Sequence, residues 1–578
     1  MSPRFLNPRI FTATVIAIVA KIRLGRMGAW TRIVPTNNFA MKLDSTRDAF
    51  LRNTGVGVGS LALVAATVVF ISAGSSRADW PQWRGPDRVG VATESPALAS
   101  HWTEDGPPQL WQSEEFPENS GEGSAVAAEG RVYLLLNWGR DDKIRTRKIN
   151  SGVLGQLRWF DQKEIPPAIL SAMEESRLSR PARLRGSKLD EWAKAWVEKE
   201  IPDEHKKWRG TAEGRLKEGK EAMSLKVLTK LEPARDREFS NPEAFEKWLD
   251  GEGINGTERE RIVAAVPTTT RHADDVVMCI DLATGKTQWK RKLPGKPDSS
   301  MGSATPTLVD GRLFVLGTTH AHCLDAVTGE AVWTSELPDR ESTSSLLVVD
   351  KLLVALAGRL VAFDRDSGEI VWKQDQVRGR RSSPSLWRHR EIDYIIANSD
   401  RKKLSCVRAV DGELLWTASG GGDSSPAVSG DIVVIHSDDA KLGLAAYRLR
   451  PDGADELWRL PHEGRGAASP IVYDGFVYLM GGGRTLCAGL ETGEVHWSQD
   501  LRVEISSPFL ADGKIFTLEG NGSNLFAFDA SPKELRQIGK ARMQAAWCPS
   551  PGFSGGLALI RHKKFLACYD LRTSGRSA

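Results

Sequence analysis

Short apolar runs alternate with polar turns at regular intervals through the second half of the chain. In residues 323–333, an apolar strand leads into an Asp-x-x-x-Gly turn, and a second strand ends on Trp333. Asp325 can accept hydrogen bonds from the backbone amides that follow it, and Gly329 allows a positive φ, so the pattern predicts strand, turn and strand. The same turn occurs at Asp281 with Gly285 and at Asp364 with Gly368, and weaker versions occur at Arg408 with Gly412 and at Leu490 with Gly493.

A tryptophan closes the second strand of each copy. These closing tryptophans lie 39 to 44 residues apart and are Trp289, Trp333, Trp372, Trp416, Trp458 and Trp497. The period is typical of the four-stranded blade of a β-propeller. It also accounts for the composition, in which 19 Trp stand against 6 Tyr. Because one blade cannot bury both faces of its own sheet, we expect each Trp to pack on a neighbouring blade.

A second feature has the same period. Small residues, in most copies followed by Pro, precede a short apolar strand and a turn such as Asp310-Gly311. These innermost strands begin near residues 124, 303, 344, 382, 424, 468, 506 and 549. The strand that ends at Trp111 has no repeat before it, and the last repeat has no closing Trp. The sequence therefore predicts an all-β fold, an eight-bladed β-propeller of four-stranded blades closed by an N-terminal strand, with an inserted helical segment.

The N-terminal region resembles an export signal. Basic residues follow Met41, a second candidate start, and precede an apolar run from Val56 to Ile71 and a small residue at Ala78. This order predicts cleavage before Asp79, with an uncleaved membrane anchor as the alternative. The predicted domains are the extension and signal (1–78), a Trp- and Pro-rich opening with the closing strand (79–139), the helical insertion (140–272) and the propeller repeats (273–578).

Two segments outside the repeats have their own local signals. The Trp- and Pro-rich opening, residues 80–86, is expected to lie extended across the fold. In the insertion, Ser187 with Asp190 predicts one helix start. Asn241 before Pro242 predicts another, because Asn caps helices and Pro is tolerated at the first helical position. The insertion is either a solvated decoration or a partner-binding arm.

Charge, cysteine and histidine usage argue against several functions. A net charge of +4 over 578 residues gives no support for a nucleic acid or an anionic membrane as partner. His320 and His322 alternate on one strand with no third ligand close in sequence, so a structural role is expected. Equivalent positions on different blades lie beyond disulfide reach, and buried small residues are therefore expected at one repeat position that is Cys in some copies and Ala in others. Its cysteines are Cys279, Cys323, Cys406, Cys487 and Cys568.

Charged residues gather just before the innermost strands, in loops expected at one mouth of the channel. They are Arg378, Arg380, Arg381, Asp423 and Arg465. Such a cluster suits an anionic ligand or a partner peptide, and a solvated channel rim is the alternative. No His-Glu-x-x-His motif occurs in the chain.

The repeats resemble those of the pyrroloquinoline-quinone (PQQ) repeat family. The resemblance is carried by residues 281–289, 325–333 and 364–372, within repeats that cover 108–135 and 274–572. It implies an eight-bladed propeller with WD40-like repetition. It also implies several possible functions, because the family includes quinoprotein dehydrogenases, the BamB-type scaffold of outer-membrane protein assembly and propellers beside bacterial kinase domains. Residues 80–86 resemble the opening of exported PQQ-like propeller proteins.

The dehydrogenases of this family carry a disulfide between adjacent cysteines over the cofactor. They also carry a calcium-binding set of Glu, Asn and Asp with a catalytic Asp. This chain has no adjacent cysteines, and the sequence does not place such a set. The residues therefore do not support PQQ with calcium, and we expect no cofactor, no metal and no catalytic residue.

The leading hypothesis is a non-catalytic, exported propeller that acts as a monomeric scaffold for a protein partner in the cell envelope. The expected location is periplasmic or secreted, with no membrane span after signal cleavage and no nucleic acid partner. A PQQ-dependent dehydrogenase that oxidises an alcohol or sugar is one alternative, and a ligand-sensing propeller is the other.

Overall fold

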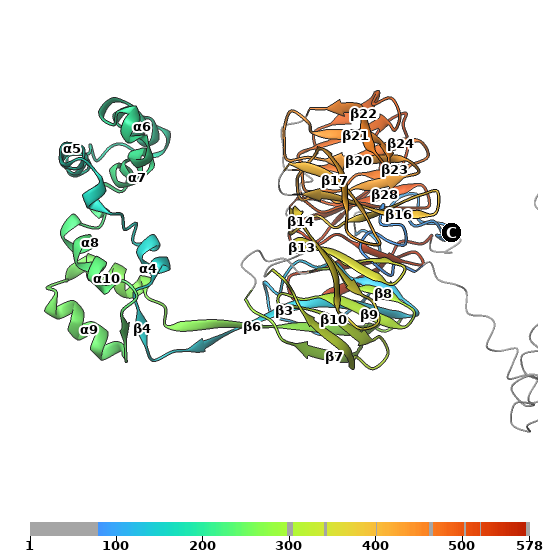
Figure 1. The fold of residues 1–578 in the computed structure, drawn as a ribbon, viewed down its shortest axis with the longest axis horizontal. Coiled ribbons are helices and arrows are strands. Elements are labelled where there is room, and N and C mark those ends of the chain that lie inside the picture. The colour runs from blue at the N-terminus through green and yellow to red at the C-terminus, as the bar shows by residue number, and fades with distance from the viewer. Residues whose placement is uncertain are drawn as a thin grey trace, which may run out of the picture. The chain divides into compact units, whose positions relative to one another are not determined.

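The computed structural model describes residues 79–573 except 104, 298–303, 340–343, 400–401, 462–465, 502–504 and 521. The predicted signal and its apolar run therefore lie outside the described residues. The described chain is mostly β, with nine antiparallel sheets and one group of helices (Figure 1). Within these residues, no helix combines the length and apolar character needed to cross a membrane.

Seven sheets have four strands, one has three and one has two. The first large sheet contains β2 (Val126–Ala128), β3 (Arg131–Lys143), β6 (Thr269–Asp281) and β7 (Thr287–Leu293). The second contains β8 (Thr307–Val309), β9 (Arg312–Leu316), β10 (His320–Asp325) and β11 (Ala331–Glu336). The third contains β12 (Leu347–Val349), β13 (Leu352–Asp364) and β14 (Ile370–Gly379). The fourth contains β15 (Ser385–His389), β16 (Ile392–Ser399), β17 (Lys403–Arg408) and β18 (Leu414–Ser419).

The remaining four-stranded sheets follow in chain order. The fifth contains β19 (Ala427–Ser429), β20 (Ile432–His436), β21 (Leu444–Arg450) and β22 (Gly453–Leu460). The sixth contains β23 (Ile471–Tyr473), β24 (Phe476–Gly481), β25 (Arg484–Gly489) and β26 (Val495–Gln499). The seventh contains β27 (Phe509–Ala511), β28 (Lys514–Leu518), β29 (Asn524–Asp529) and β30 (Gln537–Arg542). The eighth contains β31 (Gly552–Ser554), β32 (Leu557–Arg561), β33 (Leu566–Asp570) and β1 (Gln109–Gln112).

The eighth sheet joins the two ends of the described chain. Strand β1 pairs antiparallel with β33, and Trp111 lies opposite Cys568. In the second sheet, Trp333 of β11 lies opposite Cys323 of β10 in the same way. Strand β1 therefore stands where the fourth strand of a repeat stands.

The third sheet differs from the predicted four-stranded blade. Strand β13 runs unbroken over a range that in the neighbouring sheets holds two strands. At the junction, Gly358 has a φ of +78°, and Gly358 and Arg359 pair with Gly379 and Arg378 of β14. Because the connecting residues are themselves paired, the hydrogen-bond ladder does not break there.

The repeat tryptophans join neighbouring sheets. Seven indole N–H groups each donate to a backbone carbonyl of another sheet at 2.8–3.2 Å, and they belong to Trp111, Trp289, Trp333, Trp372, Trp416, Trp458 and Trp497. Trp111 donates to Leu282 of the first sheet, and Trp289 donates to Ala326 of the second. In the seventh sheet, Gly539 lies opposite Ala527, and the ring of Trp102 packs on Gly539 instead. The predicted packing of Trp on a neighbouring blade is thus confirmed in these sheets.

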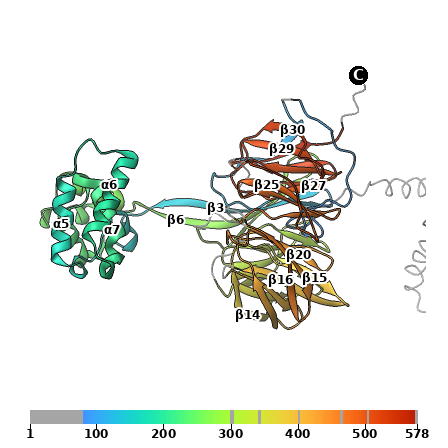
Figure 2. The same ribbon diagram turned by 90° about the horizontal axis from the view of Figure 1, so that it is seen from above.

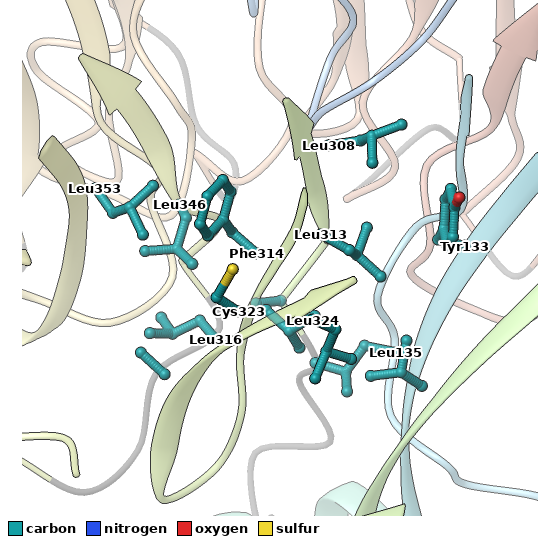
Figure 3. Packing of buried hydrophobic residues seen from close by; sticks show 14 of the residues in the cluster. Tyr133, Leu135, Leu308, Leu313, Phe314, Leu316, Cys323, Leu324, Leu346 and Leu353 are labelled. Atoms are coloured by element: carbon teal, nitrogen blue, oxygen red, sulfur yellow. The ribbon is translucent and has the colours of Figure 1, made fainter. Parts of the chain in front are cut away.

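Buried apolar side chains fill the space between sheets. Figure 3 shows this core where β9 and β10 face the first and third sheets, with Phe314, Cys323 and Leu324 between Tyr133 and Leu353. All five of these side chains are fully buried. Burial of such residues against a neighbour is what holds a repeat sheet that has no core of its own.

The insertion leaves the first sheet through its two longest strands. Strands β3 and β6 stay paired as far as Lys143 and Thr269, beyond the length of the other sheets (Figure 1). Between them lie the short pair β4 (Arg147–Lys148) and β5 (Glu238–Phe239) and the helices α4 (Ser151–Gln156), α5 (Pro167–Leu178), α6 (Gly186–Glu200), α7 (Arg209–Glu218), α8 (Leu225–Leu231), α9 (Pro242–Gly251) and α10 (Gly256–Ala265).

The helical segment has its own core. Its buried cluster draws all its members from residues 149–266, and Figure 2 shows α5, α6 and α7 side by side. The predicted start of α9 is confirmed, because Asn241 Oδ1 accepts from the Ala244 amide at 2.8 Å and Pro242 is the first helical residue. The helix predicted to start at Ser187 is present as α6, but it begins one residue earlier, at Gly186, and no side chain caps it.

Two constraints favour glycine in each turn: the backbone has a positive φ, and a tryptophan ring packs where a Cβ would lie. Gly329 has a φ of +72°, and a Cβ on it would lie 2.6 Å from Cε3 of Trp289. Gly311 has nearly the same φ, +71°, but no atom within 4 Å of the same position. Substitutions at these two positions therefore distinguish the effect of backbone strain from the effect of contact with the tryptophan.

We expect Gly311→Ala to cost about 1–2 kcal/mol of unfolding free energy from its left-handed backbone. Gly329→Ala should cost a further ~1–3 kcal/mol, because the methyl group overpacks against Trp289. Urea denaturation of the two variants measures the difference. Equal losses would show that the tryptophan contact is dispensable.

Candidate functional site in the central channel

The innermost strands are joined by a ring of hydroxyl groups. We define the hydroxyl ring as Ser124, Thr305, Ser345, Ser383, Ser425, Ser469, Ser507 and Ser550, which lie two residues before the innermost strand of each of the eight large sheets. Each residue's backbone N–H donates to the hydroxyl oxygen of the next residue in the ring, at 2.8–3.2 Å. The last bond runs from the Ser550 amide to Ser124 Oγ, so the series returns to its start.

The Trp- and Pro-rich opening lies inside this ring. We call residues 80–92 the plug. Trp80 forms a β-bridge with Ala127, and Leu308 N donates to the Pro81 carbonyl at 2.8 Å. Trp83 Nε1 donates to Ser425 Oγ at 3.1 Å. At the other end of the plug, Leu510 N donates to Gly90 at 2.7 Å, and Ala92 N donates to Leu510 at 2.8 Å. The plug therefore bonds to innermost segments of the first, second, fifth and seventh sheets.

Two arginines complete these contacts. Arg84 Nη2 donates to the carbonyls of Val89 at 2.7 Å and Pro470 at 2.5 Å. Arg88 donates to the carbonyls of Leu346 at 2.9 Å and Ser345 at 3.2 Å. These bonds add the third and sixth sheets, so that six sheets hold the plug.

Both guanidinium groups are buried without a carboxylate. Arg84 and Arg88 are each 3% exposed, and neither forms an ion pair with any described residue. Burial lowers the pKa of each to about 9, and for Arg84 the nearby charge of Arg88 contributes. Both pKa values stay well above neutral pH, so the centre of the channel carries two cations.

The expectation that this segment is extended is wrong. Arg84, Gly85, Arg88 and Gly90 all have positive φ values, between +59° and +79°. Gly85 N donates to Gln82, and Gly90 N donates to Arg84, so the segment folds in consecutive turns. Arg84 and Arg88 were not among the residues that the sequence predicted to bind. The available signal was two arginines beside glycines in a stretch otherwise rich in Trp and Pro.

The charged residues predicted at the channel mouth are only partly brought together. Arg381 Nη1 lies 3.1 Å from Asp423 Oδ2, and this bond links the fourth and fifth sheets. The side chains are 45% and 20% exposed, so the pair contributes little to stability. Arg378 lies on β14 and Arg380 is exposed, while Arg465 lies outside the described residues. Their role in binding stays a prediction.

A cavity that no sequence motif indicated lies between the fourth and fifth sheets. It measures about 410 Å³ and is lined by residues that include His389, Tyr394 and Arg450. Two of its basic side chains already have partners. His389 Nδ1 lies 3.2 Å from Asp431, and Arg450 Nε lies 3.3 Å from Asp452.

The cysteines and histidines pack as expected. Cys279, Cys323, Cys406 and Cys487 are fully buried opposite the tryptophans of their sheets, and burial raises the pKa of Cys406 to about 12. His320 and His322 lie on the same side of β10, with ring centres 5.9 Å apart. Among the residues described, no group of three or more acidic, His or Cys side chains is placed to hold a metal ion.

The comparisons with known proteins agree with the repeat. Residues 273–389, 356–448 and 446–534 match the model of the family described as outer membrane protein assembly factor BamB. These residues cover less than half of the chain, and the sheets that they form are similar to the PQQ-like repeats of that family. The comparison with curated proteins returns no match.

Solved structures of two kinds are similar. BamB from Moraxella catarrhalis is 15% identical over 52% of this chain and 90% of that chain, with a TM-score of 0.42. The quinohemoprotein alcohol dehydrogenase from Comamonas testosteroni is 10% identical over 88% of this chain and 83% of that chain, with a TM-score of 0.49. At these values the likeness carries no functional argument.

The buried His322 should make the fold sensitive to acid. Its Nδ1 lies 3.0 Å from Thr334 Oγ1, its Nε2 is buried without a partner, and burial lowers its pKa to about 3. A base with a lowered pKa binds its proton better in the unfolded chain. The contribution of neutral His322 to the free energy of unfolding is therefore complete above about pH 6.5. It falls by up to ~1.4 kcal/mol per pH unit between that value and pH 3.

We expect His322→Gln to reduce this slope of unfolding free energy against pH, measured by urea denaturation from pH 7 to pH 4. The control His272→Gln replaces an exposed ring on β6 and reports any general effect of the substitution. A slope unchanged by His322→Gln would contradict the assignment.

Proposed function

We propose that the chain is a non-catalytic, eight-bladed propeller, closed by β1, that serves as a scaffold for a protein partner in the bacterial envelope. The filled channel is the observation that carries this proposal. The plug bonds to six sheets at the place where a propeller would otherwise offer a ligand cavity. The family description, outer membrane protein assembly factor BamB, supports a role in protein assembly.

The residues present do not fit PQQ with calcium in the channel. Calcium is bound by several carboxylate and carbonyl oxygens, and a neighbouring cation weakens its binding. The charged groups of the plug that face the innermost strands are the cations Arg84 and Arg88. The nearest inner-strand carbonyls already accept from these guanidinium groups. We derive no catalytic step through the cofactor.

The ring closure that this proposal assumes is supported by three sets of contacts. Strand β1 pairs with β33, Trp111 donates to Leu282, and the hydroxyl ring returns from Ser550 to Ser124. Closure removes the exposed strand edges that an open array would present. It leaves the outer strands and the helical segment as the surfaces for a partner.

We assign partner binding to the helical segment. It has its own buried core, which the propeller does not need, and the extended pair of strands β3 and β6 connects it to the first sheet. Leu178 of α5 is 50% exposed and Val263 of α10 is 37% exposed, an apolar contribution to an otherwise charged surface. Export by the segment before Asp79 would place this arm in the periplasm.

A clean deletion tests this assignment. Lys143 lies opposite Thr269, and Ile144 N donates to Thr268 at 3.0 Å, so residues 144–268 can be replaced by an Asn-Gly turn. We expect the shortened chain to keep the melting temperature of the repeats. It should lose, by at least about tenfold in Kd, the partner that cross-links to the full chain in the envelope fraction, because the binding arm is absent.

The control is the double variant Arg380→Ala with Arg381→Ala, which removes the predicted mouth cluster and should keep the partner. Loss of the partner in this variant alone would move the site to the channel mouth. A stoichiometric complex of the full chain with PQQ and calcium, with reduction of an electron-accepting dye, would contradict the non-catalytic proposal.

A further inference from the structure

A small cavity lies between the plug and the hydroxyl ring. Trp83 and Arg84 line it on the plug side, and Ser124, Thr305, Ser507 and Ser550 line it on the side of the sheets. It offers about 10 Å³ of room for the centre of a water-sized sphere. That is enough for about one particle of the size of a water molecule.

Arg84, which lines this cavity, has unused donors in its guanidinium group. Its Nη2 donates hydrogen bonds to the carbonyls of Val89 and Pro470. Its Nε and Nη1 are buried and have no acceptor among the described residues. A buried cation is expensive unless an opposite charge or a full set of hydrogen bonds accompanies it. The Arg84 side chain has neither, and Arg88 adds a second positive charge nearby.

The opposite wall also presents donors. Each hydroxyl oxygen of the ring accepts a backbone N–H bond from its neighbour, as Thr305 Oγ1 does from Ser124 and Ser550 Oγ from Ser507. A hydroxyl that accepts in this way still has its own proton to donate. The charged and hydroxyl side chains that line the cavity are therefore donors, beside the apolar side chains of Trp80, Ala125, Pro508 and Pro551, and a negative charge complements these donors.

We propose that this cavity binds a monatomic anion, chloride under physiological conditions, through Arg84 Nε and Nη1 and the hydroxyl groups of Ser124, Thr305, Ser507 and Ser550. The space excludes sulfate, phosphate and carboxylates, which need room for several heavy atoms. The anion neutralises one of the two buried cations. It also ties the plug to the first, second, seventh and eighth sheets, where the ends of the described chain meet.

This site makes the stability of the fold depend on halide. A ligand that binds the folded chain raises its stability by RT ln(1 + [L]/Kd). At a hundredfold excess over Kd, the melting temperature of a chain of this size should rise by about 2–3 °C. Sodium chloride and sodium bromide should produce this rise over sodium gluconate at equal ionic strength, and sodium sulfate should show no saturable effect of this kind.

The variants Arg84→Met and Arg88→Met separate the site from a general salt effect. Arg84 lines the cavity, whereas Arg88 is an equally buried arginine of the plug that does not. We expect the halide-dependent rise to vanish in Arg84→Met and to persist in Arg88→Met. A rise that persists in Arg84→Met would overturn the proposal.

Crystals of the wild-type chain grown with bromide give a test that does not depend on the folding of a variant. The proposal expects an anomalous difference peak beside Arg84 Nε and Nη1. A cavity without a bromide peak, together with equal melting temperatures in chloride and gluconate, would show that water alone satisfies Arg84 and would overturn the site.

Discussion

The rest of the structure depends on the hydroxyl ring. Each of its eight members both donates a backbone N–H and accepts one, across every junction between the large sheets. A single neutral hydrogen bond contributes only about 1 kcal/mol, but a buried donor left without a partner costs about 1–3 kcal/mol. Because the series closes on itself, separating any two neighbouring sheets carries this cost. The repeat tryptophans reinforce seven of these eight junctions with a second set of contacts.

The plug follows from this arrangement. Carbonyls next to the hydroxyl ring, at Ser345, Leu346 and Pro470, accept hydrogen bonds from the two arginines of the plug. The plug thereby contacts sheets that are far apart in sequence and fills the space where they meet. The helical segment makes no demand on these contacts, because it leaves through β3 and β6 and has a separate core. The scaffold proposal therefore rests on a stable set of repeat sheets that carries a separately packed helical segment.

The sequence predicts the local parts of this fold well. The turn from Asp325 to Gly329 and the cap at Asn241 depend on neighbours a few residues away, and both are confirmed. The burial of Cys323, which the repeat predicts, is confirmed as well. The pairing of β1 with the last repeat was accessible by counting copies. The turns of the plug and the partners of Arg84 and Arg88 were not, because the accepting carbonyls lie more than 250 residues away and carry no side-chain signature. The pair Arg381–Asp423 shows the same limit, since charges that looked available for a ligand bind each other across two sheets.

Hydrogen exchange of residues 80–92, followed by mass spectrometry, tests the filled channel most directly. The backbone amides of Trp80, Gly85, Gly90 and Ala92 all donate within the plug or to the innermost strands. The account predicts that these amides exchange as slowly as those of the innermost strands β8 and β27. Exchange within seconds, as for a free chain terminus, would contradict a plugged channel and reopen it to a ligand.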